Sequence, residues 1–557
     1  MGLHFFVGQA PREKAGAELR GSARGEAARP RTWGNRLRQV YLWAIFALLW
    51  LGGATFALKS FHDVYYPFQW DDDEGAVWWE AAHITHLREA YHPLQQYPYI
   101  VVPYPPVYHC VTWVAARITG DFLVAGRLVC VASALGISLL LGFLVFRASP
   151  PRIPARVRGG GALLAALLCF RLDSLNRYIP EMGVDLLAIF LAFLGVFLFL
   201  RSRSKPAGQY AAFALFVMAA FTKQTMVAAP LACLVACAFI SPGAALRRLL
   251  FSLTVGLGVL SCLAWATDGE ILRHLFLYNL RQPFSFTHWI NGMQENLIGM
   301  IPIATLACLA LLPFLRHLTS PRGGMLLRWL RAGVRSSPYR QALLVLGLEI
   351  VLALLTSAAY GKLGSGVHYF LEWNLACCAL AGLVLVRALA SWRPSSRYTA
   401  GGAALFLLVF FAALTGLPDS LRRINHVFLL TPGEWHVQQV RRSSAAAALE
   451  IIEETPGPVF CENMLLVMKA RKEIPIEPGI NCYLAKAGVW DQSAFVNLIT
   501  TRKFGVIILR NLDNPFWTDA IVGAVKQGYM PTQRLGDPSV ENGYYTVYRP
   551  QPERAKP

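Results

Sequence analysis

The sequence predicts an all-α polytopic membrane protein of about eleven transmembrane helices with added juxtamembrane helices, followed by a small C-terminal α/β domain. Composition gives the first indication: 55% of the 557 residues are hydrophobic and 15% are charged, whereas roughly a quarter are charged in a soluble domain. The second indication is the recurrence, from residue 40 to residue 417, of apolar segments near the length of about 20 residues that a bilayer requires.

Each apolar segment is read as one span. Two of them, Tyr210–Phe221 and Met226–Ile240, are short and predict a tight helical hairpin, which leaves the number of spans open by one or two. The first span follows a long basic leader, so no cleavable signal peptide is evident. The predicted spans are Val40–Leu58, Phe122–Phe146, Gly160–Leu175, Gly183–Leu200, Tyr210–Phe221, Met226–Ile240, Leu249–Thr267, Leu297–Leu315, Leu343–Tyr360, Val367–Val386 and Gly401–Leu417.

The loops after every second span carry arginine and lysine but no aspartate or glutamate. When the spans alternate, these five loops lie on the side of the N-terminus, and the positive-inside rule makes that side cytoplasmic. The formal net charge of +19 is therefore mostly a matter of topology. Because the charges are dispersed over short loops, we expect no nucleic-acid partner.

Three regions follow from this order. Residues 1–38 predict a disordered, basic cytoplasmic leader, residues 39–417 the transmembrane domain with a first outer loop at 59–121, and residues 418–557 an extracytoplasmic α/β domain. Strands are predicted at Val459–Phe460, Phe504–Leu509 and Tyr544–Tyr548, and helices near Ser444–Glu453 and Thr518–Gln527. Most of the eleven cysteines lie in spans. Cys461 and Cys482 lie in the outer domain, where a disulfide is an open alternative.

The run Asp71-Asp72-Asp73-Glu74-Gly75 stands shortly after the first span. Charge kept beside a bilayer is energetically expensive and usually functional. The alternative is a solvated loop or a helix N-cap, since aspartate before a helix caps well. The run predicts chemistry at the outer membrane face.

Cationic side chains at the same face are candidates for binding an anionic group. Lys223 lies at the outer turn of the short hairpin, where it either binds phosphate or extends to the interface as an isolated lysine does. Arg127 lies inside the second span and needs a partner, for which Asp185 and Asp173 are available, so that a structural ion pair competes with phosphate binding. Weaker candidates are Lys362, His368 and Arg281.

An ordered set of motifs resembles the GT-C glycosyltransferases of the glycosyltransferase 39 or Rgt-like type, relatives of protein mannosyltransferases and of the lipid A aminoarabinose transferase. Each motif is weak alone, and the resemblance covers about residues 40–417. The matching elements are Asp73-Glu74-Gly75, Tyr104-Pro105-Pro106-Val107-Tyr108, Gly126-Arg127-Leu128, Val184-Asp185-Leu186-Leu187-Ala188, Thr222-Lys223-Gln224-Thr225 and the segment from Gly364 to Glu372.

The resemblance implies a bacterial inner-membrane enzyme that uses a polyprenyl-phosphate-linked sugar as donor and a lipid, glycan or protein as acceptor. It implies an inverting single displacement at the extracytoplasmic face with Asp73 as general base and Glu74 beside it. The implied donor-phosphate residues are Lys223, Arg127, Lys362 and His368, and the implied supporting residues are Asp185, Asp72, Tyr104 and Glu372.

Differences from the family's motifs argue against some of the related families. His368 stands where bacterial members carry asparagine, and the tail resembles no family. The missing Trp-Trp-Asp-Tyr-Gly element argues against an oligosaccharyltransferase, and the lack of a large inserted outer domain argues against a eukaryotic protein mannosyltransferase.

A divalent metal ion remains open, with Asp73, Glu74 and His83 as candidate ligands. A polytopic transporter or lipid flippase is the alternative function, although neither internal repeats nor midplane polar clusters support it. A receptor with an outer sensing domain is a third reading, against which the charges predicted within or beside the spans argue. The sugar, the prenol length, the acceptor and the oligomeric state are left open by the sequence.

Overall fold

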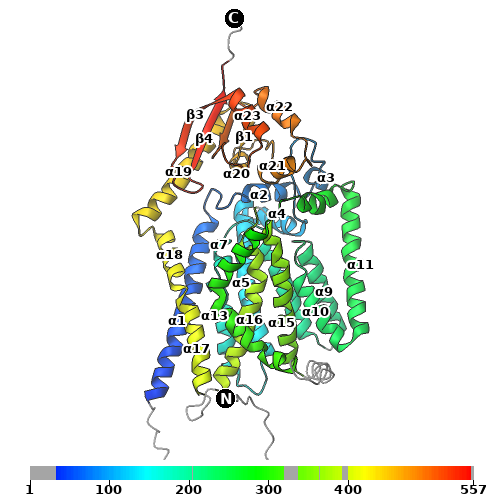
Figure 1. The fold of residues 1–557 in the computed structure, drawn as a ribbon, viewed down its shortest axis with the longest axis vertical. Coiled ribbons are helices and arrows are strands. Elements are labelled where there is room, and N and C mark those ends of the chain that lie inside the picture. The colour runs from blue at the N-terminus through cyan, green and yellow to red at the C-terminus, as the bar shows by residue number, and fades with distance from the viewer. Residues whose placement is uncertain (1–32, 204, 319–336, 363, 392–398, 553–557) are drawn as a thin grey trace, which may run out of the picture. The chain divides into compact units, whose positions relative to one another are not determined.

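The computed structural model describes residues 33–203, 205–318, 337–362, 364–391 and 399–552. Two units, residues 1–43 and residues 44–557, are distinguished by their internal contacts, and the second contains all the features discussed below. The predicted disordered leader, residues 1–38, lies outside the described residues up to residue 32, and the prediction is wrong for residues 33–38, because the first long helix begins at Trp33. Figure 1 labels the elements along the chain.

Helices long and apolar enough to cross a membrane recur along the described residues, as predicted, and make the chain a multi-pass membrane protein. Two of the remaining predicted spans form the shorter apolar helices α9 (Pro206–Ala220) and α10 (Ala228–Ile240), and two form α6 (Ala155–Leu168) and α8 (Asp185–Arg201). The long helices are α1 (Trp33–Val64), α5 (Phe122–Ala148), α11 (Pro242–Ala266), α13 (Phe286–Leu318), α15 (Pro338–Thr356), α16 (Leu371–Ser391) and the pair α17 (Thr399–Leu414) and α18 (Leu417–Phe428).

The predicted span Gly160–Leu175 is wrong in its outer half. The α-helix ends at Leu168, a short 3-10 turn follows, and a separate helix α7 begins at Asp173. Arg171 lies at the break, where its Nε donates to the Ala412 carbonyl at 3.0 Å. The polar side chains at this end therefore serve contacts between helices instead of a continuous apolar span.

The centre of the bundle is α16, which packs against α5, α6, α13 and α15 and has 83% of its apolar window buried. Helix α11 is the opposite case: none of its window is buried, and it contacts mainly α9 and α10. An apolar helix without protein cover is stable only in lipid. The described helices thus range from the core of the bundle to its lipid-facing edge.

The first outer loop contains the expected juxtamembrane helices α2 (Glu74–His83), α3 (Leu87–Ala90) and α4 (Val107–Thr119). Helix α4 ends at Gly120, whose positive φ of 76° suits glycine. Asp121 then caps α5 by accepting hydrogen bonds from the amides of Leu123 and Val124 at 2.7 and 3.0 Å. These turns place α2 and α4 directly before the second long helix.

The C-terminal domain is α/β, as predicted. Its sheet has the order β1-β2-β4-β3, with β1 (Val459–Cys461) and β2 (Val506–Leu509) parallel and the other pairs antiparallel. Strand β3 (Tyr529–Gly536) escaped prediction because it contains Pro531 and is largely exposed, whereas β4 (Tyr544–Pro550) was expected. The helices are α19 (Pro432–Glu454), α20 (Met464–Lys469), α21 (Pro478–Lys486), α22 (Ser493–Thr500) and α23 (Asp519–Gly528).

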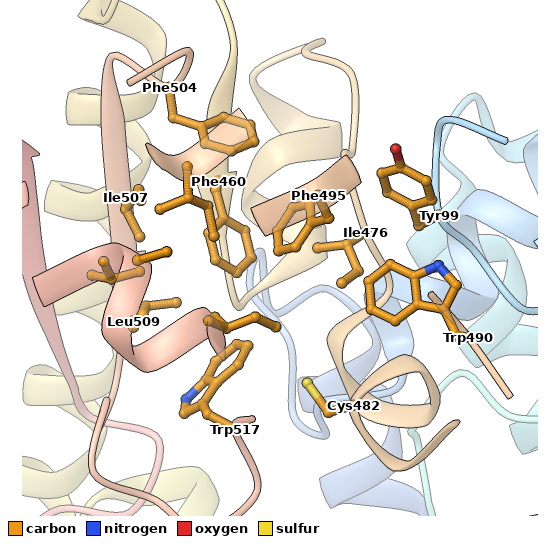
Figure 2. Close-up of a cluster of buried hydrophobic side chains, with 14 of the residues drawn as sticks. Tyr99, Phe460, Ile476, Cys482, Trp490, Phe495, Phe504, Ile507, Leu509 and Trp517 are labelled. Atoms are coloured by element: carbon orange, nitrogen blue, oxygen red, sulfur yellow. The ribbon is translucent and has the colours of Figure 1, made fainter. Parts of the chain in front are cut away.

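One hydrophobic core joins the C-terminal domain to the first outer loop (Figure 2). Tyr99 of that loop contacts the rings of Trp490 and Phe495, with centroids 5.4 and 6.1 Å apart. Its amide donates to the Pro475 carbonyl, and its carbonyl accepts from the Glu477 amide, each at 2.9 Å. Because these hydrogen bonds and ring contacts cross the boundary at residue 418, the C-terminal domain and the first outer loop are packed as one body.

The two cysteines of the C-terminal domain do not form a disulfide. Cys461 and Cys482 are both buried, free thiols, so the disulfide alternative is not adopted. Cys482 belongs to the shared core, where it packs as a small apolar side chain.

Candidate functional site

The acidic run forms the turn that leads into α2. Asp73 occupies the N-cap position, yet its side chain makes no capping hydrogen bond. Its amide instead donates to Asp71 Oδ1 at 3.0 Å, and Asp72 Oδ1 accepts from Gln69 at 3.0 Å. The capping alternative therefore does not account for the Asp73 carboxylate, which remains accessible at the surface.

The surroundings of Asp73 favour its protonated form. Although the side chain is accessible to solvent, surrounding protein atoms displace part of its water, and this desolvation raises its pKa well above the usual value; the charges of Asp71, Glu477, Asp72 and Asp185 raise it further. Burial also raises the pKa of Asp71 to about 6 and that of Glu477 to about 7. A carboxylate with a raised pKa is a stronger base once it is deprotonated, which is the property that general base catalysis requires.

Glu74 has a different environment from its neighbour. It is fully buried, and both carboxylate oxygens bind Arg127: Nε lies 2.8 Å from Oε1 and Nη2 lies 2.7 Å from Oε2. The same carboxylate accepts from the amides of Trp70 and Met182 at 2.7 and 2.8 Å. Glu74 thus has no oxygen left over for an acceptor or a metal ion.

Arg127 is equally occupied. Besides Glu74, it donates to the carbonyls of Tyr66 and Phe68 at 2.6 and 2.7 Å, and it is fully buried. The structure therefore favours the ion-pair alternative for Arg127. The two partners that the sequence suggested were wrong, because Asp185 pairs with Lys223 and Asp173 pairs with Arg177.

Lys223, in the turn between α9 and α10, forms a close ion pair with Asp185, the first residue of α8. Lys223 precedes α10, and its side chain is 2% exposed, whereas that of Asp185 is 15% exposed. His368 Nε2 lies 3.9 Å from Asp185 Oδ1, and Lys223 Nζ lies 4.1 Å from the centre of the Tyr369 ring. Asp73 is within electrostatic range of both members of the pair. The structure thus brings together Asp73, Asp185, Lys223 and His368, which are widely separated in the sequence.

Tyr104 belongs to the same group. Burial raises the pKa of its phenol well above the usual value, and Tyr369, Asp185, Asp73 and Glu80 act on it electrostatically. Lys362 is half-buried, and its pKa is lowered by burial and by the charge of Lys223. The two lysines are therefore within electrostatic range of each other.

Two predicted residues lie elsewhere. Glu372 is buried within α16, where Oε1 accepts from the Ala229 amide at 3.2 Å, and it interacts electrostatically with Glu349. Arg281 is exposed between the π-helical turn that ends at Tyr278 and α13. In the described part of the chain, neither forms a hydrogen bond or an ion pair with Asp73 or with the Lys223–Asp185 pair.

The predicted metal ligands are not brought together. His83 Nδ1 contacts the Trp79 carbonyl at 2.8 Å, and its ring stacks on that of Trp79 with centroids 4.2 Å apart. Since the Glu74 oxygens are also occupied, Asp73, Glu74 and His83 do not form a ligand group in the described part of the chain. The residues present do not fit a divalent ion at this place.

Contributions of the C-terminal domain to the site were missed. Glu477 caps α21 through the amides of Gly479 and Ile480, and its charge acts on Asp73. Arg510 at the end of β2 binds Asp72 Oδ2 and Glu462 Oε1, each at 2.7 Å. No sequence motif links residues so far apart, and the only available signal was the presence of charged residues next to short apolar strands.

Only the comparison with solved structures places the fold among known proteins. No protein-family model matches the chain, and no curated protein sequence matches it. The structure is similar to the crystal structure of ArnT from Cupriavidus metallidurans bound to undecaprenyl phosphate, with a TM-score of 0.54 and 11% identity over 95% of this chain and 100% of that chain. It is also similar to apo ArnT from the same organism, with a TM-score of 0.56 and 14% identity over 89% of this chain and 97% of that chain.

At these identities the likeness establishes the fold alone. The chain has the GT-C fold that its ordered motifs predicted, and it covers nearly all of ArnT in length. The substrate and the chemistry must be argued from the residues of the site.

Proposed function

We propose that this chain is an integral membrane glycosyltransferase that moves a sugar from a polyprenyl-phosphate donor to an acceptor hydroxyl. The observation that carries the proposal is the meeting of Asp73, a carboxylate of raised pKa, with the Lys223–Asp185 pair on a GT-C fold. Base and cation are the two groups that displacement at a sugar phosphate requires. The ArnT structure that contains undecaprenyl phosphate supports a polyprenyl-phosphate ligand for this fold.

The proposed reaction is a single displacement with inversion. The acceptor oxygen forms a bond to C1 of the sugar while the bond from C1 to the phosphate oxygen breaks. The acceptor proton passes to the Asp73 carboxylate, and the electron pair of the broken bond leaves with the polyprenyl phosphate. Positioning of the acceptor and neutralisation of the departing charge supply the rate enhancement.

The cations of the site receive the phosphate in this proposal. Lys362 is half-buried and accessible, whereas Lys223 is held by Asp185. The phosphate thus approaches Lys362 first and competes with Asp185 for Lys223, and His368, which is 13% exposed beside Asp185, binds it from the inner side as a hydrogen-bond donor. A phosphate that enters between Lys223 and Lys362 is stabilised by both charges, because Lys223 is buried and Lys362 half-buried, and charges are screened less away from bulk water.

The remaining predicted residues take supporting roles. Glu74 and Arg127 hold the backbone that precedes Asp73 in place. Arg127 binds the carbonyl of Tyr66 at one end of this segment, and Glu74 binds the amide of Trp70 at the other. Tyr104 borders the acceptor side next to Asp73 and Asp185. We place the site on the extracytoplasmic face of a bacterial inner membrane, with the N-terminus in the cytoplasm.

The test is transfer of a radiolabelled sugar from a polyprenyl-phosphate donor in reconstituted membranes. Asp73→Asn keeps the size of the side chain but removes the base, so transfer should fall by about 10²–10⁴-fold, the usual contribution of such a group. Asp491→Asn, at a fully exposed aspartate of the C-terminal domain, is the matched control and should transfer like the wild type. Transfer by Asp73→Asn near the wild-type rate would remove Asp73 from the base role.

The same vesicles distinguish the proposed glycosyltransferase from the alternative function, a transporter or lipid flippase. A transporter or flippase would move a labelled lipid between leaflets without forming a sugar–acceptor product. Lipid movement that survives Asp73→Asn, in the absence of any transfer by the wild type across a panel of donors and acceptors, would replace the glycosyltransferase proposal.

A further inference from the structure

A second group of polar side chains lies at the outer end of α1. Asp63 is fully buried there, and its Oδ1 atom lies 2.7 Å from His62 Nδ1 and 3.0 Å from His426 Nε2. His426 comes from α18, near the point where the chain enters the C-terminal domain. The three ligand atoms all lie within 4.8 Å of one another.

The hydrogen-bond accounting of His426 requires a positive charge at this point. Its Nδ1 lies 2.8 Å from Glu434 Oε1 and 3.0 Å from Gln438 Nε2. The two hydrogens of the Gln438 amide reach the His426 carbonyl at 2.8 Å and Glu434 Oε1 at 3.1 Å. Because a carboxylate only accepts, Nδ1 then carries the hydrogen that Glu434 receives. In the neutral imidazole Nε2 then has a lone pair, which faces the Asp63 carboxylate. Two acceptors 3.0 Å apart repel each other unless a proton or a metal ion lies between them.

We propose that His62, Asp63 and His426 bind a divalent transition-metal ion, best matched by Zn²⁺. Two imidazole nitrogens and one carboxylate oxygen form a donor set that zinc prefers, with a fourth position open. Zinc ligands lie about 2.0–2.2 Å from the ion, so the three side chains need only separate slightly to admit it. The proposed ligands are distinct from Asp73 and from the residues of the proposed glycosyl transfer, and the proposal does not rest on that function.

The surroundings support a metal centre over a simple hydrogen-bond cluster. Glu434 would orient His426 from its second nitrogen, an arrangement that metal-bound histidines commonly have. Lys59 Nζ lies 2.7 Å from Asp63 Oδ2 and would hold the second carboxylate oxygen. The side chain of His62 is 39% exposed, which gives the ion a route from solvent.

The location gives the ion a structural task. It would tie the end of α1 to the junction of α18 and α19, where Leu429 has a positive φ of 52°. Trp70, which directly precedes the acidic run, donates its indole N–H to the Asp63 carbonyl at 3.1 Å and lies 5.4 Å from the His426 ring. A metal here would therefore stabilise the corner from which the acidic run begins.

The experiment measures zinc in the purified, untagged full-length chain by mass spectrometry, after removal of metal with a chelator and dialysis against zinc. The wild type should retain about one equivalent per chain, as expected for a three-ligand site, and should melt at a higher temperature with zinc than without. His62→Gln and His426→Gln should lose both properties. Glu434→Gln should weaken zinc binding by about 10–100-fold.

The matched control is His436→Gln. His436 is also in α19, is 54% exposed and contacts Asp537 outside the cluster, so this variant should bind zinc like the wild type. Zinc content at background in the wild type, or unchanged zinc and melting in the His62→Gln/His426→Gln double variant, would overturn the proposal. In the first case a proton on His426 would hold the cluster together.

Discussion

At the scale of single residues, neighbouring carboxylates of the acidic run 71–74 have different environments and roles. Asp73 remains accessible and has a raised pKa, whereas Glu74 is buried and saturated by Arg127 and two backbone amides. Asp72 reaches outward to Arg510. The direction in which α2 leaves the turn decides which carboxylate faces the ligands, because adjacent helical residues point about 100° apart.

The raised pKa of Asp73 predicts the pH dependence of transfer. A base acts only after it loses its proton, so transfer should rise with pH through a pKa that lies above the usual aspartate value. The Asp71 charge raises that pKa, and Asp71→Asn removes the charge while retaining an oxygen for the Asp73 amide. The acid limb of the kcat/KM profile should therefore move to lower pH.

A pH series of sugar transfer checks this expectation. Asp513→Asn, at a position that is 78% exposed and paired with Lys526, serves as the control and should leave the limb in place. An acid limb that stays in place in Asp71→Asn would show that Asp73 is not the titrating base.

The role of the buried Lys223–Asp185 pair is tested by comparing a single variant with a double variant. Lys223→Met leaves Asp185 without its cation, and breaking a buried pair from one side costs about 3–5 kcal/mol. Lys223→Met/Asp185→Asn removes both charges and should melt closer to the wild type, but its apparent donor affinity should remain poor. Recovery of donor affinity in the double variant would reduce the pair to a structural role.

At the scale of elements, α2 is held against α20 of the C-terminal domain at very short distance. A Cβ atom on Gly75 would lie 2.4 Å from the Leu465 amide nitrogen and 2.9 Å from Met464. Glycine is therefore required here for close approach and not for an unusual φ. This contact and the shared core around Tyr99 make the C-terminal domain part of the support for the acidic turn.

Gly75→Ala tests that support. The added methyl group must push α2 away from α20, and overpacking of this kind destabilises by about 1–3 kcal/mol, with a parallel loss of transfer because Asp73 moves with α2. Gly256→Ala in α11 meets no atom within 4 Å and should leave melting and transfer unchanged. Thermal melting in detergent checks both, and equal melting of the two variants would contradict the close packing.

At the scale of the whole molecule, the basic loops set the proposed orientation. Lys205 and Arg203 lie between α8 and α9, at the ends opposite Asp185 and Lys223. The positive-inside rule places these basic residues in the cytoplasm. The acidic turn and the C-terminal domain then face the other side.

Single cysteines in a background without accessible thiols test the orientation. Ala207→Cys, in the first turn of α9, should be shielded from an impermeant thiol reagent in intact cells. Asn291→Cys in α13 and Ser539→Cys before β4 should react, since all three positions are exposed in the structure. Reaction at residue 207 with protection at residue 539 would invert the topology and move the site to the cytoplasmic face.

The sequence alone determined the features that depend on short windows of residues. About 20 apolar residues in a row make a span wherever they occur, and loop charge sets its direction. The multi-pass character, the juxtamembrane helices and the α/β character of the C-terminal domain are accordingly confirmed, whereas the span Gly160–Leu175 was wrong in its second half; the ordered motifs indicated the GT-C fold.

Tertiary structure alone decided which charged groups meet. Arg127 binds Glu74, 53 residues away in the sequence, and not Asp173 or Asp185. His426 contacts Asp63, which is 363 residues away in the sequence. Glu477, whose charge raises the pKa of Asp73, belongs to a domain with no recognisable motif. The physical reason is that hydropathy is a local property of the chain, whereas the partner of a buried charge depends on how distant helices pack, and a buried charge binds the partner that packing brings within reach.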